Sequence, residues 1–119
     1  MKGERILVAD DDDSSLSRIV MVIDRMGEGA DLLVIATATN VEEVQGLVEG
    51  GLRPTLAIVD NRFPREGDGN RAKEIIKKYS PKTKVASFST DKNVGWGDEN
   101  WLKELSPSEI IQKIVELQH

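Results

Sequence analysis

Residues 6–13 read Ile6-Leu7-Val8-Ala9-Asp10-Asp11-Asp12-Asp13, a short apolar run followed at once by four acids. Apolar residues without polar alternation are typical of a strand that is buried on both faces of a sheet. Similar apolar runs occupy residues 32–36, 56–59 and 84–88, and a last extended stretch spans residues 99–102. The chain therefore predicts five strands, and the first of them ends directly at a cluster of carboxylates.

Segments in which apolar residues recur at helical spacing lie between most of these strands and after the last one. They cover residues 16–26, 41–48, 72–79 and 107–117. Gly27 and Gly29 are expected to end the first helix, and Gly50 and Gly51 the second. Strands that alternate with helices indicate an α/β fold, in which a doubly wound parallel sheet is covered by helices on both faces. We expect one such domain over residues 1–119.

Two helix starts can be read directly from capping patterns. Asn40 followed by Glu43 is typical of a capping box. Ser106, Pro107 and Glu109 give a stronger signal, because Pro107 would take the first helical position behind a capping serine. Both patterns predict where the helices begin.

The connection between the last two strands is different. A strand-to-strand crossover that contains a helix needs about 10–12 residues or more. Residues 90–98 are fewer and include Gly95 and Gly97. We therefore predict that the helix expected here is absent or reduced to one turn, and that Trp96 lies in an irregular loop.

Charged side chains follow three of the strands. Asp10 and Asp11 follow the first, Asp60 the third and Lys103 the last. The carboxyl ends of parallel strands share one crevice, which is where such folds bind ligands. Carboxylates suit a hard cation such as Mg²⁺, and an ammonium group suits a phosphoryl group. The competing interpretation is a solvated acidic loop that also caps a helix, a role we assign to Asp12 and Asp13.

The order of these residues resembles that of the receiver domain of bacterial two-component response regulators. The resemblance covers the whole chain: an acidic pair after strand one, Asp60 followed by Phe63-Pro64 and Asp68-Gly69, Ser89 after strand four and Lys103 after strand five. It implies a three-layer flavodoxin-like fold with a five-stranded parallel sheet in the order 2-1-3-4-5. It also implies a stand-alone signalling domain of the cytoplasm.

The resemblance assigns a role to each site residue. Asp60 would be the phosphoacceptor, taking a phosphoryl group from a histidine kinase or a phosphotransfer protein. Asp10, Asp11 and Asp60, together with the backbone carbonyl of Arg62, would hold Mg²⁺. Lys103 would neutralise charge on the phosphoryl oxygens, and Ser89 would hydrogen-bond the phosphoryl group. Such a domain passes a signal to a downstream protein and is an acceptor of one phosphoryl group rather than a turnover enzyme.

The chain departs from the family pattern at several positions. Glu104 replaces the usual proline after the lysine, and the loop from Asp60 to Asp68 is one residue longer than usual. Asn100 stands where the family commonly has an aromatic switch residue, unless Trp101 substitutes for it. The altered fifth strand and the absent helix favour an alternative, a pseudo-receiver that is not phosphorylated and acts as a protein-binding module. The intact acidic pair, Asp60, Ser89 and Lys103 argue against it. We also hypothesise that Arg62 and Asp91 pair across the crevice and restrict water attack on the acyl phosphate.

A third function is an enzyme. The Asp10–Ser14 run is similar to the opening of haloacid-dehalogenase-like phosphatases, in which Asp10 would be the nucleophile, but no downstream acidic pair follows a late strand. The net charge of -5 argues against a nucleic-acid partner, and the run of four apolar residues before Asp10 is too short for a signal-peptide core or a membrane span. The chain has no cysteine, which excludes thiolate chemistry.

Overall fold

The computed structural model describes residues 3–26 and 28–117, and its elements alternate as the sequence predicts. The elements, in chain order, are β1 (Glu4–Ala9), α1 (Asp13–Met26), the short 3₁₀ helix η1 (Glu28–Ala30), β2 (Leu32–Ala38), α2 (Val41–Glu49), β3 (Leu56–Asp60), α3 (Asp68–Tyr79), β4 (Lys84–Ser89), β5 (Glu99–Leu102) and α4 (Pro107–Glu116). All strand pairs are parallel, in the order β2-β1-β3-β4-β5. The predicted fold class and strand order are confirmed.

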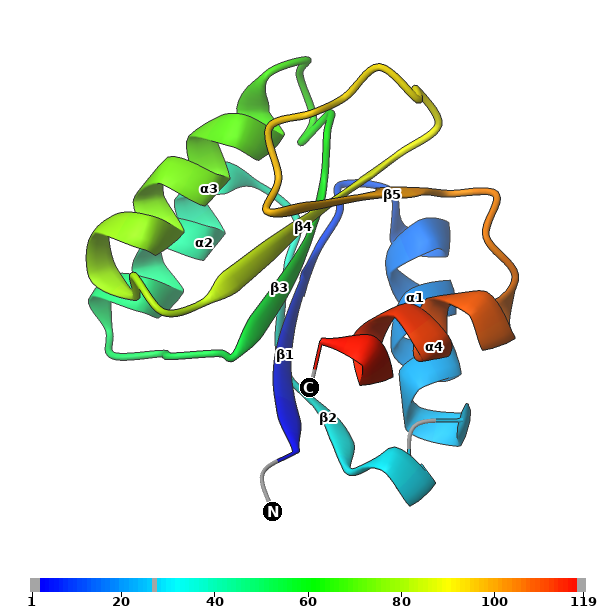
Figure 1. Ribbon diagram of the computed structural model, residues 1–119. Coiled ribbons are helices and arrows are strands. Elements are labelled where there is room, and N and C mark those ends of the chain that lie inside the picture. The colour runs from blue at the N-terminus through cyan, green and yellow to red at the C-terminus, as the bar shows by residue number, and fades with distance from the viewer. Residues whose placement is uncertain (1–2, 27, 118–119) are drawn as a thin grey trace.

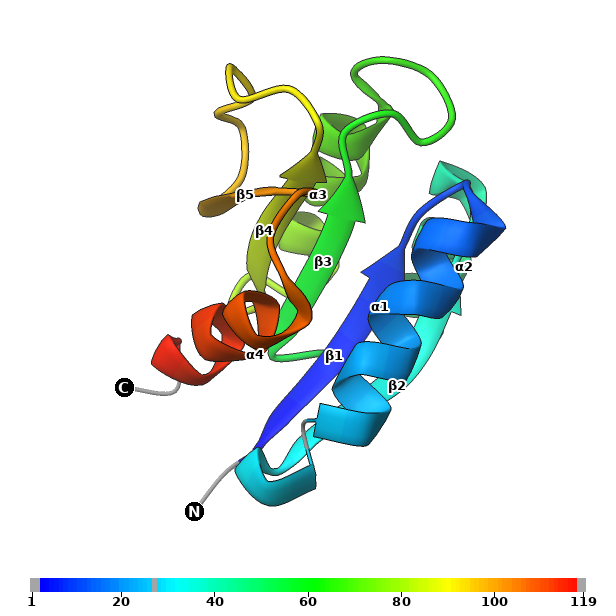
Figure 2. The same ribbon diagram turned by 90° about the vertical axis from the view of Figure 1, so that its right-hand side faces the viewer.

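Helices cover both faces of the sheet. Figures 1 and 2 show α1 and α4 on one face and α2 and α3 on the other. Alternate residues of β1 divide between these layers: Ile6 and Val8 pack with α1 and α4, while Leu7 and Ala9 pack with α2 and α3. The same alternation along β3 makes every one of its residues buried. The apolar run therefore has no polar alternation because both of its faces are core.

The helix ends agree with most of the sequence signals. The Ser106 side chain accepts the Glu109 N–H, and Glu109 accepts the Ser106 N–H, so the predicted capping box is complete. Asn40 caps α2 as expected, but the Glu43 carboxylate accepts from the N–H and hydroxyl of Thr39 instead of from Asn40. Helix α1 ends at Met26. Gly27, which was expected to end it, lies outside the described residues.

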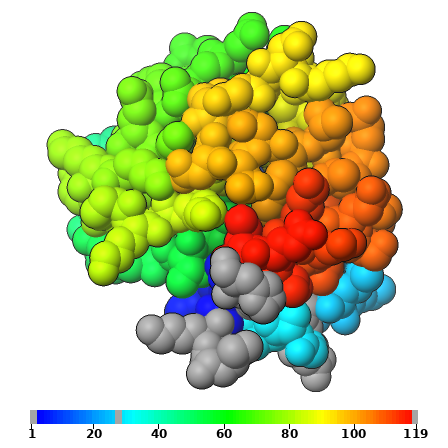
Figure 3. Space-filling model, in the orientation of Figure 1, coloured from blue at the N-terminus to red at the C-terminus, as the bar shows by residue number. Residues whose placement is uncertain are grey.

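Residues 90–98, all of them described, contain no helix, which confirms the prediction for this connection. The segment is attached at Asp98, which exchanges two bonds of 2.8 Å with Val85: its N–H donates to the Val85 carbonyl, and its carboxylate accepts the Val85 N–H. That carboxylate also pairs with Lys77 at 2.7 Å and with Lys73 at 3.6 Å. Figure 3 shows the segment in yellow and orange at the surface, between α3 and the last part of the chain. Specific polar contacts to β4 and α3 hold this connection in place.

Candidate functional site

The sheet register brings the predicted acids together. Ala9 pairs with Val59, so Asp10, which follows β1, and Asp60, the last residue of β3, are neighbours at the carboxyl edge. The backbone hydrogen bonds of the sheet continue beyond β1 and β5. The Asp10 N–H donates to the Ala38 carbonyl at 3.0 Å, and the Lys103 N–H donates to the Ser89 carbonyl at 2.8 Å. Asp60 and Ser89 are themselves the last residues of their strands, one residue further than the apolar runs predicted. The rigid sheet thus positions all four side chains.

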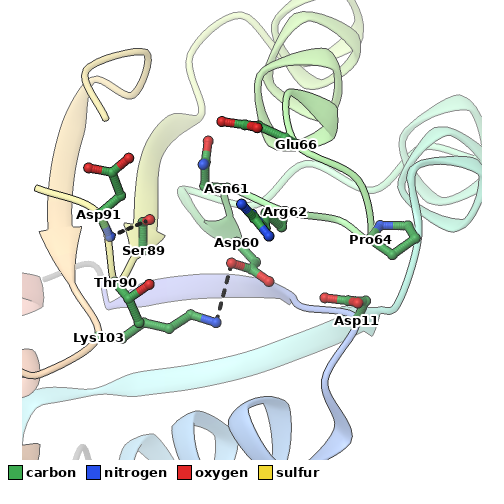
Figure 4. A pocket seen from close by; sticks show the side chains of 10 residues that line it. All are labelled: Asp11, Asp60, Asn61, Arg62, Pro64, Glu66, Ser89, Thr90, Asp91 and Lys103. Atoms are coloured by element: carbon green, nitrogen blue, oxygen red, sulfur yellow. Dashed lines mark hydrogen bonds and ion pairs between the residues drawn. The ribbon is translucent and has the colours of Figure 1, made fainter. Parts of the chain in front are cut away.

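Lys103 joins the two buried carboxylates. Its Nζ lies 3.2 Å from Asp10 Oδ2 and 3.2 Å from Asp60 Oδ1. The other oxygen of Asp10 accepts the N–H of Asp12 at 2.9 Å. Lys103 also lies over the Phe88 ring, 5.8 Å from its centroid. Figure 4 shows the lysine reaching across the edge of the sheet toward Asp60, with Asp11 on the far side of that carboxylate.

The carboxylates of Asp10 and Asp60 repel each other, and the single ammonium group of Lys103 neutralises only one of their two negative charges. Burial, and then the negative charge of Asp10, raise the pKa of Asp60 to about 7, although Lys103 partly offsets them. Burial alone would lower the pKa of Lys103, but the carboxylates of Asp10 and Asp60 outweigh it and raise that pKa. Asp60 is only 7% exposed, so water screens the repulsion between the two carboxylates poorly. A second cation at this edge would do so.

The acids fit such a cation. One carboxylate oxygen from each of Asp10, Asp11 and Asp60 lies within 4.8 Å of the others, and this is the one group of three potential metal-ligating side chains among the described residues. Three oxygen donors, two of them buried and one exposed, match the preference of Mg²⁺ for carboxylates together with retained water. Asp12 is occupied elsewhere, because its side chain accepts from Ser14 N–H and the Ser15 hydroxyl at the start of α1.

An open pocket of about 450 Å³ lies in front of Asp60. Its lining includes the predicted residues Asp11, Asp60, Arg62, Ser89 and Lys103, together with Asn61, Pro64, Glu66, Thr90 and Asp91. The Ser89 hydroxyl is at the pocket wall and accepts the Asp91 N–H at 2.9 Å, as Figure 4 shows. The cluster is thus reachable from solvent by a group of phosphoryl size.

The pairing predicted between Arg62 and Asp91 is wrong for this structure. Both residues line the pocket, but the structure records no ion pair between them. The Asp91 carboxylate instead accepts the N–H of Asn93 at 2.8 Å, which stabilises the turn at the start of the 90–98 segment. This local contact costs little chain entropy, so it prevails over a pair across the pocket.

No family model and no curated protein matches the sequence. Solved structures match over nearly the whole chain. The signal receiver domain of NarL from Mycobacterium tuberculosis superposes with a TM-score of 0.81 at 20% identity, covering 98% of this chain and 97% of that one. The chain has the receiver-domain fold.

Other receiver domains match similarly. The REC domain of AraT from Geobacillus stearothermophilus gives a TM-score of 0.77 at 21% identity, with 98% of this chain and 96% of that chain covered. The isolated REC domain of RcsB from Salmonella enterica serovar Typhimurium gives 0.80 at 17% identity, with 98% and 88% covered. Both are regulators of the class that the sequence resembles.

Against this receiver fold, the departures of the fifth strand acquire a structural meaning. Asn100 is held in place, because its side-chain oxygen accepts from the Ser87 hydroxyl at 2.7 Å and from Gly97 N–H at 2.9 Å. Trp101 is buried in the core between the sheet and helices α1 and α4. Despite Glu104, the backbone at Lys103 remains paired with Ser89.

Sequence reasoning missed Asn61, Glu66 and Thr90 as parts of the pocket wall. Asn61 and Thr90 directly follow the ends of β3 and β4, so their position after a strand was a usable signal. Glu66 gave no such signal, since it lies in an irregular loop where Arg62 and Glu66 form an isolated antiparallel bridge. That loop folds over the pocket in a way that periodicity does not encode.

Proposed function

We propose that this chain is a phosphoacceptor domain of two-component signalling, in which Asp60 receives a phosphoryl group from a histidine kinase or a phosphotransfer protein. The observation that carries the proposal is the contact of Lys103 with both Asp10 and Asp60, beside Asp11 and in an open pocket. Positioning and charge neutralisation account for most of the catalysis of phosphoryl transfer. This cluster supplies both.

The transfer would proceed from the Asp60 carboxylate. One of its oxygens attacks the donor phosphorus, the phosphorus–nitrogen bond breaks, and the bonding electron pair leaves with the nitrogen, which takes up a proton. Lys103 neutralises charge that develops on the phosphoryl oxygens. The Ser89 hydroxyl, whose oxygen accepts the Asp91 N–H, would donate its own hydrogen to a phosphoryl oxygen. The domain then holds one phosphoryl group as a signal for a downstream protein of the cytoplasm, without turning over a substrate.

Mg²⁺ would be held by Asp10, Asp11 and Asp60, with Arg62, which lines the pocket, offering its backbone carbonyl. When bound, it would neutralise charge on the acceptor and on the incoming phosphoryl oxygens. The raised pKa of Asp60, about 7, supports this assignment, because a carboxylate in this position needs a cation to be fully ionised at neutral pH.

The experiment that tests the proposal is the intact mass after incubation with phosphoramidate and Mg²⁺. We expect the mass of one phosphoryl group to be added to the protein, and no gain in EDTA or in Asp60→Asn. Asp24→Asn is a matched control, since it removes an exposed carboxylate of α1 and should leave the gain intact. A gain that persists in Asp60→Asn would move the acceptor to another residue and refute the assignment.

A pseudo-receiver is the second candidate, and Asn100 is the observation that favours it. Asn100 is not aromatic, and its hydrogen bonds to Ser87 and Gly97 hold its side chain in place. It therefore cannot act as a mobile aromatic residue of β5 that changes position on phosphorylation. In that case the wild-type protein would gain no phosphoryl group under conditions that phosphorylate an ordinary receiver, and the 90–98 segment would act as a fixed binding surface.

A phosphatase that uses Asp10 as nucleophile has little support from the geometry. Asp10 is buried and does not line the open pocket. Asp60 does line it. Hydrolysis of a phosphomonoester that is lost in Asp10→Asn and retained in Asp60→Asn would reverse this conclusion.

The described residues contain no helix long and apolar enough to cross a membrane.

A further inference from the structure

Asn61, between the acceptor and Arg62, is bound at three points. Its N–H donates to the Phe88 carbonyl at 3.2 Å, and its carbonyl accepts the Gly69 N–H at 3.2 Å. Its side-chain oxygen accepts the indole N–H of Trp96 at 2.7 Å. Figure 4 shows the Asn61 side chain pointing away from the Asp60 carboxylate, so this residue contacts the reacting group only through the backbone.

Trp96 reaches this turn from the 90–98 segment, 35 positions further along the chain. The side chain is partly buried against the core layer of α2 and α3. Its own carbonyl accepts from Lys73 Nζ at 2.7 Å, which fixes the segment to α3. The indole is therefore held both by packing and by a backbone contact, and its N–H is presented to Asn61 in a defined place.

The packing around Gly69 shows how closely these parts fit. A Cβ at this position would lie 2.4 Å from the Asp60 carbonyl oxygen and 2.6 Å from Cζ2 of Trp96. The acceptor strand, the first turn of α3 and the indole thus meet over a residue with no side chain. Movement of the indole would disturb the peptide that follows Asp60, because both pack closely around Gly69.

We infer that Trp96 is a positioning residue for the acceptor turn: its indole N–H holds Asn61 and thereby fixes the backbone that carries Asp60 and the Arg62 carbonyl. The inference rests on the proposed function for its chemical consequence. It gives the 90–98 segment a role within the site. These residues stand where a helix was expected between β4 and β5, and they also set the geometry of the acceptor.

The test uses variants that each remove one partner. Trp96→Phe keeps an aromatic ring and removes the N–H, and Asn61→Ala removes the acceptor oxygen. Tyr79→Phe is the matched control, because it removes one aromatic donor, the Tyr79 hydroxyl bond to Glu49, in the same layer but away from the pocket. Each variant is examined for Mg²⁺ affinity by calorimetry, for the rate of phosphoryl gain from phosphoramidate, and for amide hydrogen exchange without metal.

We expect Trp96→Phe and Asn61→Ala each to lower the Mg²⁺ affinity and the phosphorylation rate by roughly two- to ten-fold, the range that one neutral hydrogen bond supports. The double variant should lose no more than either single variant, because both remove the same bond. Exchange of the Asn61 and Gly69 amides should accelerate in both, and Tyr79→Phe should leave all three measurements unchanged.

The two proposals can fail separately. If the wild-type protein binds no Mg²⁺ and gains no phosphoryl group, the proposed function fails, while faster exchange at Asn61 and Gly69 in Trp96→Phe alone would still support the positioning role. If Trp96→Phe leaves those amides as protected as in the wild type, or if the two single losses add in the double variant, the positioning role is refuted.

Discussion

Replacing Asp60 by asparagine should make the metal-free protein more stable at pH 8. The pKa of Asp60 is about 7 in the folded protein, against an ordinary value of 3.8. Between these values the folded protein retains a proton that the unfolded chain has lost. The free energy of unfolding therefore falls as pH rises from about 4 to about 7. At 1.36 kcal/mol per pKa unit, this difference amounts to as much as about 4 kcal/mol above pH 7.

Asp60→Asn removes that cost and leaves Lys103 paired with Asp10. We expect its urea midpoint at pH 8 in EDTA to rise by as much as about 2 M, for a slope of about 2 kcal/mol per molar urea. At pH 4.5 most of the difference should vanish, because Asp60 is then protonated and uncharged in the folded wild-type protein. Asp24→Asn, which removes an exposed carboxylate, should match the wild type at both pH values. An Asp60→Asn protein that is no more stable than the wild type at pH 8, or equally stabilised at pH 4.5, would refute this account of the cluster.

Two further substitutions test the residues around the site and the scaffold. Lys103→Ala leaves two buried carboxylates without their shared ammonium, so the rate of phosphoryl gain from phosphoramidate, followed by intact mass, should fall by about 100-fold or more. Lys82→Ala, at an exposed lysine, should leave that rate unchanged. An unchanged rate in Lys103→Ala would show that Lys103 has no part in the transfer. Ser106→Ala removes the cap of α4 and should lower the free energy of unfolding in urea by about 1 kcal/mol. Ser108→Ala, at the second residue of the helix, should lower it less, and equal losses would contradict a specific cap.

The sheet and its site could be predicted because both depend on short stretches of sequence. Ile6–Ala9 and residues 56–59 are apolar throughout since both faces of β1 and β3 are core, and the first charged residues after them mark the carboxyl edge. Once β1 and β3 pair in parallel with Ala9 beside Val59, Asp10 and Asp60 are neighbours. The missing helix was also predictable, because nine residues are too few for a crossover that contains a helix.

Contacts between irregular segments could not be predicted in the same way. The bond from Trp96 to Asn61 joins two loops, and no periodicity relates their positions. Burial of Trp101 depends on which face of β5 meets the core, and a strand of four residues with one buried position carries too little pattern to decide that. The expected pair of Arg62 and Asp91 failed because Asp91 had a closer partner in its own turn, the N–H of Asn93.

The connection between β4 and β5 contains no helix, and the backbone hydrogen-bonding groups of Val85 in β4 still need partners. Asp98 supplies these partners. Its backbone and carboxylate complete both hydrogen-bonding groups of Val85. The carboxylate would be costly there without partners, because burial raises its pKa; its contacts with Lys77, Val85 N–H and Lys73 reverse this and lower it. Stability from Asp98 is thus present at neutral pH and is lost only as pH falls through that lowered pKa. The segment then extends over α3 to Trp96 and the acceptor turn, so the contacts that replace the helix also support the site.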